Sequence, residues 1–294
     1  MKVTIVGLGL IGGSIAIDLR ATGFATEIIG VDNNPEHVMQ TNSRGLCDEI
    51  LPLKKAIQNT DIVILAIPVD AVLKVLPQVL DGISARTTVT DMGSTKAVIL
   101  AKVARHPKRK QYVATHPMAG TEFSGPLAAV RGLFQNRTTV ICDAEKSSAR
   151  DLRRIDALYD ALGMRKVYMS STEHDMHAAF VSHLSHISSF ALANTVLDKE
   201  RDVGTIFNLA GGGFESTVRL AKSSPEMWNP IFSQNREHIL NALDLYLEHL
   251  QVFRETLQKH KPERVIKLMR KANSIKRVLQ SLNEKLSDKP RGAK

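Results

Sequence analysis

The feature that most constrains this chain is a glycine pattern that directly follows its first apolar run. Residues 3–6 are short and β-branched, and Gly7-Leu8-Gly9-Leu10-Ile11-Gly12 follows them and opens a helical pattern over residues 11–21. In such a strand–turn–helix unit the first glycine allows the tight turn, the second admits a pyrophosphate and the third lets helix and strand pack. The pattern predicts a dinucleotide site at a helix N-terminus.

Asp32 ends the second predicted strand, at the distance beyond Gly12 where dinucleotide-binding folds place an acid. A carboxylate at this place accepts hydrogen bonds from the adenosine ribose hydroxyls and repels a 2′-phosphate. Asn33 and Asn34 follow it, so no arginine is at hand to bind that phosphate. The sequence therefore favours NAD over NADP. The alternatives are a glycine-rich turn without a ligand and an Asp32 that only ends a strand in solvent.

Short β-branched runs alternate with helical patterns through the first half of the chain, which is typical of βαβ units. The runs are continuously apolar, as expected for strands covered on both faces. They span residues 3–6, 27–31, 62–66, 87–91, 112–115 and 138–142, with 164–169 as a candidate seventh, and residues 71–80 predict a further helix. We expect an NAD-binding Rossmann-type domain with a mostly parallel sheet over residues 1–170.

After residue 169 the pattern is helical to the end, which predicts an α/β domain followed by an all-helical one over residues 171–294. Ser170, Ser171 and Thr172 supply candidate N-caps, and residues 178–197 predict a largely buried helix. Leucines at alternating spacings of three and four predict a seam that packs against another helix, in this chain or in a second subunit: Leu240, Leu243, Leu247, Leu250 and Leu257. Pro262 opens a predicted last helix with one apolar and one basic face.

The formal charge of +9 could indicate a nucleic-acid partner, but it is concentrated at one end. Residues 254–294 contain 13 Lys or Arg and 4 acids, whereas the preceding residues carry 26 of each sign. The basic helix has no clustered aromatic residues beside its charges, so we expect no nucleic-acid partner. No run approaches the roughly 18 apolar residues of a membrane span. With no leader pattern and only Cys47 and Cys142, a cytoplasmic protein is expected.

Three further segments follow predicted strands, at the places where ligands bind in such folds. Ile67-Pro68 follows the third run, residues 93–96 follow the fourth, and residues 116–122 follow the fifth. His116 can take or share a proton near neutral pH, which removal of a hydride from a hydroxylated carbon requires. A loop histidine bonded only to backbone is the alternative.

Several of these motifs together resemble the prephenate/arogenate dehydrogenase family of tyrosine biosynthesis. They are GLGLIGGS, DMGSTK, THPMAGTEFSG, the EHD…VSHLSH helix and GGGFESTVRLAKSSPEMW, in the family's order over residues 1 to about 257. The resemblance implies oxidative decarboxylation of prephenate to 4-hydroxyphenylpyruvate, or of arogenate to tyrosine, with NAD or NADP. It also implies a homodimer formed through the helical domain. Prephenate is favoured because an acid such as Asp32 accompanies its use more often in this family.

The resemblance further implies roles for individual residues. His116 hydrogen-bonds the ring 4-hydroxyl and takes its proton as hydride leaves C4, and loss of CO2 from C1 then gives an aromatic ring. Ser94 holds that hydroxyl, the histidine and the nicotinamide together. Arg219 pairs with the ring carboxylate, which suits its forked guanidinium. The substrate pocket would include His183, His186 and Trp228, and the cofactor would contact Gly7, Leu8, Gly9, Leu10, Ile11, Gly12, Asp32, Ile67, Pro68 and Ser94.

Four histidines lie close together in the sequence and raise the question of a metal site. On one continuous helix His174 and His183 lie about 180° apart, so these side chains cannot close around one ion. His174 and His177 are therefore expected to cap or pack, and no metal is expected.

Two positions depart from the family. Ser216 stands where many members have an acid, which leaves the partner of Arg219 undefined. Ser185 replaces a proline of many members, so the helix is expected to be unkinked.

Two other functions are compatible with parts of the sequence. A β-hydroxyacid dehydrogenase would need a catalytic lysine in the second domain, for which Lys222 is the candidate near a pocket motif. A non-enzymatic dinucleotide sensor would explain the glycine pattern but not the combination of His116, Ser94 and Arg219.

Overall fold

The computed structural model describes residues 1–287, with side chains placed through residue 281. Met1–Ile239 forms one compact unit, and a second unit begins at Leu240. Among the described residues, no helix is both long enough and apolar enough to cross a membrane.

The first unit is built on an eight-stranded sheet of order β3-β2-β1-β4-β5-β6-β7-β8. Neighbouring strands are parallel except β6 and β7. This confirms the predicted α/β fold, and β8 confirms the candidate seventh strand, whereas the two-residue β3 escaped prediction. The strands are β1 (Lys2–Val6), β2 (Glu27–Val31), β3 (Glu49–Ile50), β4 (Ile62–Leu65), β5 (Thr88–Asp91), β6 (Tyr112–Pro117), β7 (Thr138–Cys142) and β8 (Arg165–Met169).

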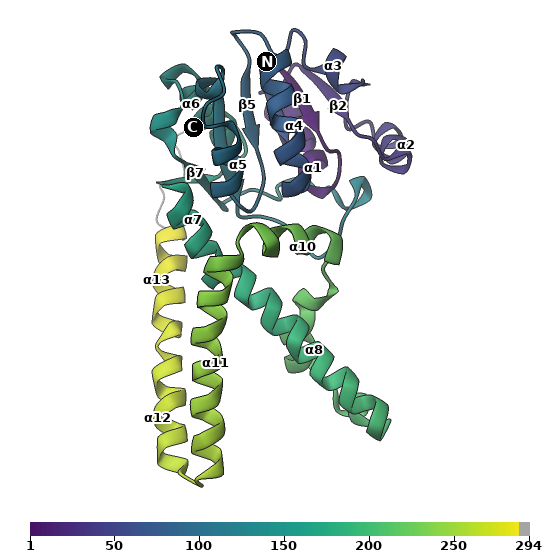
Figure 1. Cartoon of the computed structure of the whole chain (residues 1–294). Helices are drawn as coiled ribbons and strands as arrows, with labels where there is room; N and C mark the ends of the chain where they lie inside the picture. Colours follow the sequence, from purple (N-terminus) through teal and green to yellow (C-terminus); the bar gives the residue numbers. More distant parts are fainter. Residues whose placement is uncertain (288–294) are drawn as a thin grey trace. The chain divides into compact units, whose positions relative to one another are not determined.

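Helices cover both faces of this sheet, as Figure 1 shows for α1, α4, α5 and α6. One core cluster joins α1 (Leu10–Ala21) and α6 (Ala149–Ala161) to side chains such as Ile64. The other joins α4 (Val69–Gly82) and α5 (Ala97–Val103) to the next residue along the same strand, Leu65. Because successive strand residues point to opposite faces, a continuously apolar strand supplies both cores.

Shorter elements complete the connections around the sheet. They are α2 (Pro35–Ser43), α3 (Leu53–Ala56) and the single 3-10 turns η1 (Arg109–Gln111), η2 (Pro126–Ala128) and η3 (Ala144–Lys146).

The remaining part of the first unit is helical. Ser170 caps α7 (Ser171–Ala178) through a capping box with Glu173, which confirms Ser170 among the candidate N-caps. The path continues as a π-helical turn, η4 (Ala179–His183), and then as α8 (Leu184–Val203), followed by η5 (Ile206–Leu209), α9 (Gly212–Val218), η6 (Arg219–Lys222) and α10 (Pro225–Gln234). The expectation of one uniform, largely buried helix was wrong, since only Ser189 of α8 is buried.

The second unit contains most of α11 (Arg236–Gln258), together with α12 (Pro262–Asn273) and α13 (Ile275–Ser287). The predicted single last helix is interrupted at one residue, Ser274, which separates α12 from α13 and keeps right-handed helical backbone angles. Four leucines of the predicted seam are exposed, for example Leu247 at 52% and Leu250 at 46%, whereas Leu243 is partly buried.

Candidate active site

The sheet reverses its strand order at β1, and the predicted glycine turn lies at that point. β1 pairs with β2 on one side and with β4 on the other, so the loops after β1 and β4 border one crevice. A Cβ on Gly7 would lie 2.4 Å from the Ala66 carbonyl oxygen, and one on Gly12 would lie 1.9 Å from the Gly7 oxygen. A Cβ on Gly9 would meet nothing nearer than 4.0 Å. Gly7 and Gly12 are thus required by packing, whereas Gly9 borders open space.

The N-terminus of α1 is suited to an anion. Gly9 is its N-cap, no side chain caps it and its first turn carries no acid. Its N–H groups therefore remain available to phosphate oxygens, and the helix dipole favours negative charge there.

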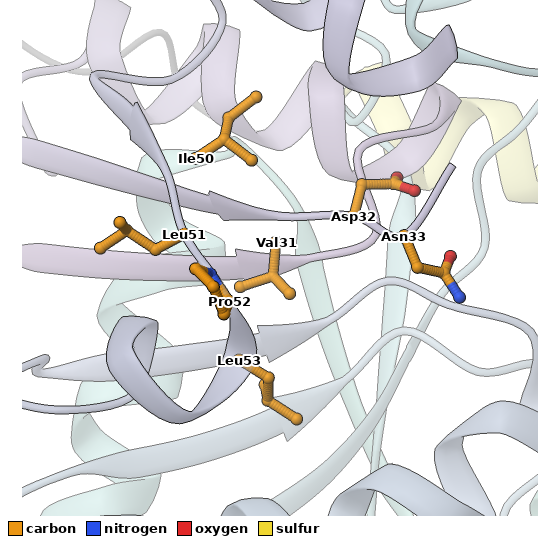
Figure 2. Close-up of a pocket in the computed structure, with 7 residues that line it drawn as sticks. All are labelled: Val31, Asp32, Asn33, Ile50, Leu51, Pro52 and Leu53. Atoms are coloured by element: carbon orange, nitrogen blue, oxygen red, sulfur yellow. The ribbon is translucent and has the colours of Figure 1, made fainter. Parts of the chain in front are cut away.

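Asp32 is held rigidly at the end of β2, with its side chain 7% exposed. Its carboxylate accepts hydrogen bonds from the backbone N–H of Leu8 and of Asn34, both at 2.9 Å. Beside it lies a hollow of about 420 Å³, shown in Figure 2, lined by Val31, Asp32, Asn33, Ile50, Leu51, Pro52 and Leu53. An apolar hollow next to a carboxylate at the end of the second strand has the composition expected for a site that binds the adenosine half of a dinucleotide. The predicted Ile67 and Pro68 lie between β4 and α4, where Ile67 packs against the core and Pro68 caps α4.

His116, near the end of β6, is the start of a chain of buried hydrogen bonds. Its Nδ1 lies 2.8 Å from Nε2 of His174, whose Nδ1 lies 2.8 Å from a carboxylate oxygen of Asp175. All three residues are at most 8% exposed. Burial lowers the pKa of His116 well below its ordinary value, and the neighbouring His174, Lys96 and His183 lower it further. His116 is therefore neutral near pH 7.

The far end of this chain is anchored on α5. The Asp175 carboxylate accepts hydrogen bonds from the backbone N–H of Lys96 at 2.8 Å and of Ala97 at 2.9 Å. Burial raises the pKa of Asp175, but the hydrogen bonds from His174, Ala97 and Lys96 outweigh it and lower the pKa overall. Sequence reasoning missed both His174 and Asp175 as parts of the site. The motif containing both, EHD, was recognised only as part of the family resemblance.

A second buried group holds the strands beneath His116. The Lys96 ammonium and the Asp91 carboxylate are completely buried and form an ion pair. Tyr112 donates to Asp91 at 2.7 Å, and Lys96 donates to the Thr115 carbonyl at 2.6 Å. This satisfied pair ties β5, β6 and the start of α5 together. Ser94 is half-buried in the same loop, and within residues 1–281 its hydroxyl has no hydrogen-bond partner, so the structure does not bond it to His116.

The predicted pocket residues His183, His186 and Trp228 do come together. The His186 ring stacks on the Trp228 indole with centroids 3.6 Å apart, and His183 meets the same indole edge-on at 5.9 Å. His183 Nε2 and Trp228 Nε1 are buried, and neither has a partner within the part of the protein that the structure describes. Paired orphan groups of this kind are expected where a ligand's polar atoms bind.

The π-helical turn explains how His183 reaches this place. A π turn has more residues per turn than an α-helix, so it rotates the following side chains less. The opposite placement of His174 and His183 expected on a uniform helix therefore does not hold. Asn235 lies between the two segments that carry His174 and His183. Its side-chain amide donates to the Asp175 backbone carbonyl at 2.7 Å and lies 3.1 Å from His183 Nδ1. Burial lowers the pKa of His183 to about 4.

Arg219 lies in η6, with its side chain 51% exposed. Its guanidinium lies 3.4 Å from the Glu122 carboxylate, in the loop that follows β6. Glu122 is thus the acidic partner of Arg219, a role that Ser216 cannot fill. Before the structure, Glu122 had appeared only as part of the THPMAGTEFSG motif. Burial lowers the pKa of His186, and the charge of Arg219 adds to this effect.

Within the described part of the chain, no group of three or more His, Cys, Asp or Glu side chains is arranged so that it could hold a metal ion.

The chain matches known proteins over nearly its whole length. The family model for the nucleotide-binding domain of prephenate dehydrogenase matches residues 15–168, and the model for its dimerization domain matches residues 170–271. Prephenate dehydrogenase of Bacillus subtilis (strain 168) is 30% identical over 281 residues, which are 94% of this chain and 76% of that protein. Cyclohexadienyl dehydrogenase of Zymomonas mobilis is 28% identical over 87% of this chain and 88% of its own length.

Solved structures agree with these matches. Prephenate dehydrogenase from Aquifex aeolicus, in complex with hydroxyphenyl propionate and NAD+, is 30% identical with a TM-score of 0.86 and covers 95% of this chain and 97% of its own. Arogenate dehydrogenase from Synechocystis is 28% identical with a TM-score of 0.75, covering 95% of this chain and all of its own. With the glycine turn, Asp32 and the buried His116 in place, the chain belongs to the prephenate dehydrogenase family and is an NAD-dependent dehydrogenase.

Proposed function

We propose that this protein converts prephenate to 4-hydroxyphenylpyruvate, with NAD as the hydride acceptor. The observation that supports this most is His116, a neutral and buried histidine near the end of β6, at the edge of the sheet that also carries the cofactor crevice. A neutral imidazole can accept the proton of the substrate's ring hydroxyl. Bound NAD supplies the acceptor for the hydride that leaves C4.

The other site residues bind and orient the substrate in this proposal. The Arg219 guanidinium takes up the ring carboxylate, whose bond to C1 must stay aligned with the ring π system. The stacked rings of His186 and Trp228, with His183 beside them, form the wall of the pocket. Ser94, whose hydroxyl has no protein partner among the described residues, holds the substrate hydroxyl next to His116.

We also propose the domain division expected from the sequence, with a cofactor domain over residues 1–170 and a helical substrate and dimerisation domain from residue 171. A homodimer is supported by the dimerization-domain match and by the exposed leucines of α11. A cytoplasmic location stays a prediction.

The test is a direct assay of purified protein with NAD and either prephenate or arogenate, followed by NADH absorbance. We expect turnover of prephenate, with a lower kcat/KM for arogenate. The reverse order would make the protein an arogenate dehydrogenase. Absence of turnover with both substrates, under NAD and under NADP, would reject the proposed function and leave the dinucleotide sensor.

His116→Asn tests the chemistry within that assay. The variant should lose turnover by at least about 100-fold, since a positioned general base contributes about 10²–10⁴-fold. Substrate binding, measured by calorimetry, should persist. His177→Asn changes an exposed histidine of α7 and should turn over like the wild type. Wild-type turnover in His116→Asn would remove His116 from this role.

A further inference from the structure

The hydrogen bonds beyond His116 have only one consistent direction when both histidine rings are neutral. The Asp175 carboxylate already accepts two backbone N–H groups, so it is ionised and can only accept from His174. Nδ1 of His174 therefore carries the proton, and in the neutral ring Nε2 has a free lone pair. The contact of 2.8 Å then requires that His116 donates from Nδ1. The remaining nitrogen of His116, Nε2, is left unprotonated.

We propose that His174 and Asp175 are positioning residues that hold His116 with Nε2 free to accept the hydroxyl proton, and that His174 stores one proton during the reaction. The proposal rests on the proposed function. Neither residue touches the reacting atoms, because both act through the ring of His116.

The proton balance of the reaction explains why the enzyme has to hold the hydroxyl proton and not to release it to solvent. The C4–H bond breaks and its electron pair leaves as hydride, while the hydroxyl proton passes to His116 Nε2 and a carbonyl forms at C4. The bond from C1 to the carboxylate then breaks, CO2 leaves, and the electron pair enters the ring to form a phenolate at that oxygen. The phenolate takes the proton back. No net proton is released, so the enzyme has only to hold it briefly.

The burial of the chain matches this requirement. His174 and Asp175 are each 2% exposed, and the carboxylate ends on the backbone of α5 rather than in solvent. A proton that arrives at His116 Nε2 allows the Nδ1 proton to move to His174 Nε2. The positive charge then lies next to the Asp175 carboxylate.

The charges around His116 favour that transfer. It is faced by Lys96 from the start of α5, by His183 from the π turn and by His174 from α7. Lys96 is already paired with Asp91, whereas His174 contacts the carboxylate of Asp175 directly. A positive charge on His116 itself is thus opposed by its surroundings, whereas the His174 ring lies 2.8 Å from a carboxylate oxygen.

The variant His174→Gln distinguishes a His174 that binds a proton during the reaction from one that only holds His116 in position. A glutamine can accept the His116 Nδ1 proton with its carbonyl and donate its amide to Asp175, but it cannot bind a further proton. We expect kcat for prephenate to fall about 100-fold. KM for prephenate and the Kd for NAD should stay at their wild-type values. The matched control, His177→Gln on the exposed side of the same helix, should leave all three unchanged.

The pH profile provides a second readout. In the wild type, the free enzyme's His116–His174 pair beside Asp175 takes up a proton as the pH falls. This proton inactivates the base and produces the acid limb of the kcat/KM profile. In His174→Gln that proton must sit on His116 without a carboxylate partner, so the acid limb should move to lower pH. A purely structural role of His174 would leave the limb in place.

Nitrogen NMR of ¹⁵N-histidine-labelled wild-type enzyme tests the resting state without substrate or cofactor. We expect an unprotonated Nε2 for His116, assigned by its loss in His116→Asn. A protonated Nε2 there, or a wild-type kcat in His174→Gln, would overturn the proposal. Failure of the wild type to turn over prephenate would instead reject the proposed function, so the two failures are distinguishable.

Discussion

At the scale of single residues, the two cations of the site have opposite roles because their surroundings differ. Lys96 is completely buried with Asp91 and held by further hydrogen bonds, so it is part of the framework. Arg219 is half exposed, and its contact with Glu122 is long at 3.4 Å. Such an exposed pair contributes little to stability. This weak contact leaves the Arg219 guanidinium available for the substrate carboxylate that we propose it binds.

This difference leads to a prediction for Arg219→Ala. Losing a charge-assisted hydrogen bond to a carboxylate costs about 2 kcal/mol, so KM for prephenate should rise about 30-fold. The melting temperature and the Kd for NAD should stay unchanged, because Arg219 lies outside the core. Lys199→Ala removes an exposed cation of α8 and is the control for net charge. An unchanged KM in Arg219→Ala would show that another group binds the carboxylate.

At the scale of elements, the turn between β1 and α1 combines a packing constraint with a binding site. A Cβ on Gly12 would lie 1.9 Å from the Gly7 carbonyl oxygen, so position 12 cannot carry a side chain while α1 and β1 are packed this closely. Gly9 has open space in front of it. The same motif thus contains two glycines required by the fold, Gly7 and Gly12, and one, Gly9, that is expected to matter only when a phosphate is bound.

Alanine substitutions should separate these two requirements. Gly9→Ala should keep the wild-type melting temperature but weaken NAD binding at least about 10-fold, since its methyl group occupies the phosphate position. Gly12→Ala should lower the melting temperature, because α1 must shift away from β1. Differential scanning fluorimetry and calorimetric NAD titration measure both effects. Equal loss of stability in the two variants would contradict this assignment.

At the scale of the whole molecule, the helical half leaves apolar side chains exposed that a single chain does not cover within its described residues. On α11 the seam leucines include Leu240 at 47%, Leu247 at 52% and Leu257 at 61% exposed. A heptad-like seam of this kind is stabilised when it packs against another helix. A second copy of the chain is the proposed partner.

Sedimentation should therefore give twice the mass of the single chain. Leu247→Glu combined with Leu250→Glu places two charges on the seam and should shift the protein to monomer. Leu245→Glu, on the same helix and 45% exposed but off the seam, should remain dimeric. A monomeric wild type would reject the homodimer, and dissociation by Leu245→Glu would place the interface elsewhere on α11.

The sequence by itself determined the α/β fold and predicted the cofactor site, and it offered His116 as one candidate base, whose role came from the family resemblance. These follow from local patterns, namely β-branched runs, glycines at a turn and an acid at the end of the second strand, which act between neighbours in the chain. Asp32 and Gly9 could be predicted in this way because strand ends and helix starts have known orientations.

Only the tertiary structure decided which side chains meet around His116. The contact with His174 spans 58 residues and the contact of Glu122 with Arg219 spans 97, so no periodicity along the chain reports them. The π turn before His183 also lacks a signal in the sequence, and it altered the helical phase on which the histidine faces were judged. Local hydrogen bonds and apolar patterns depend on residues that are neighbours in the sequence. The protonation state of a buried histidine depends instead on groups that are distant in the sequence and meet only when the chain folds.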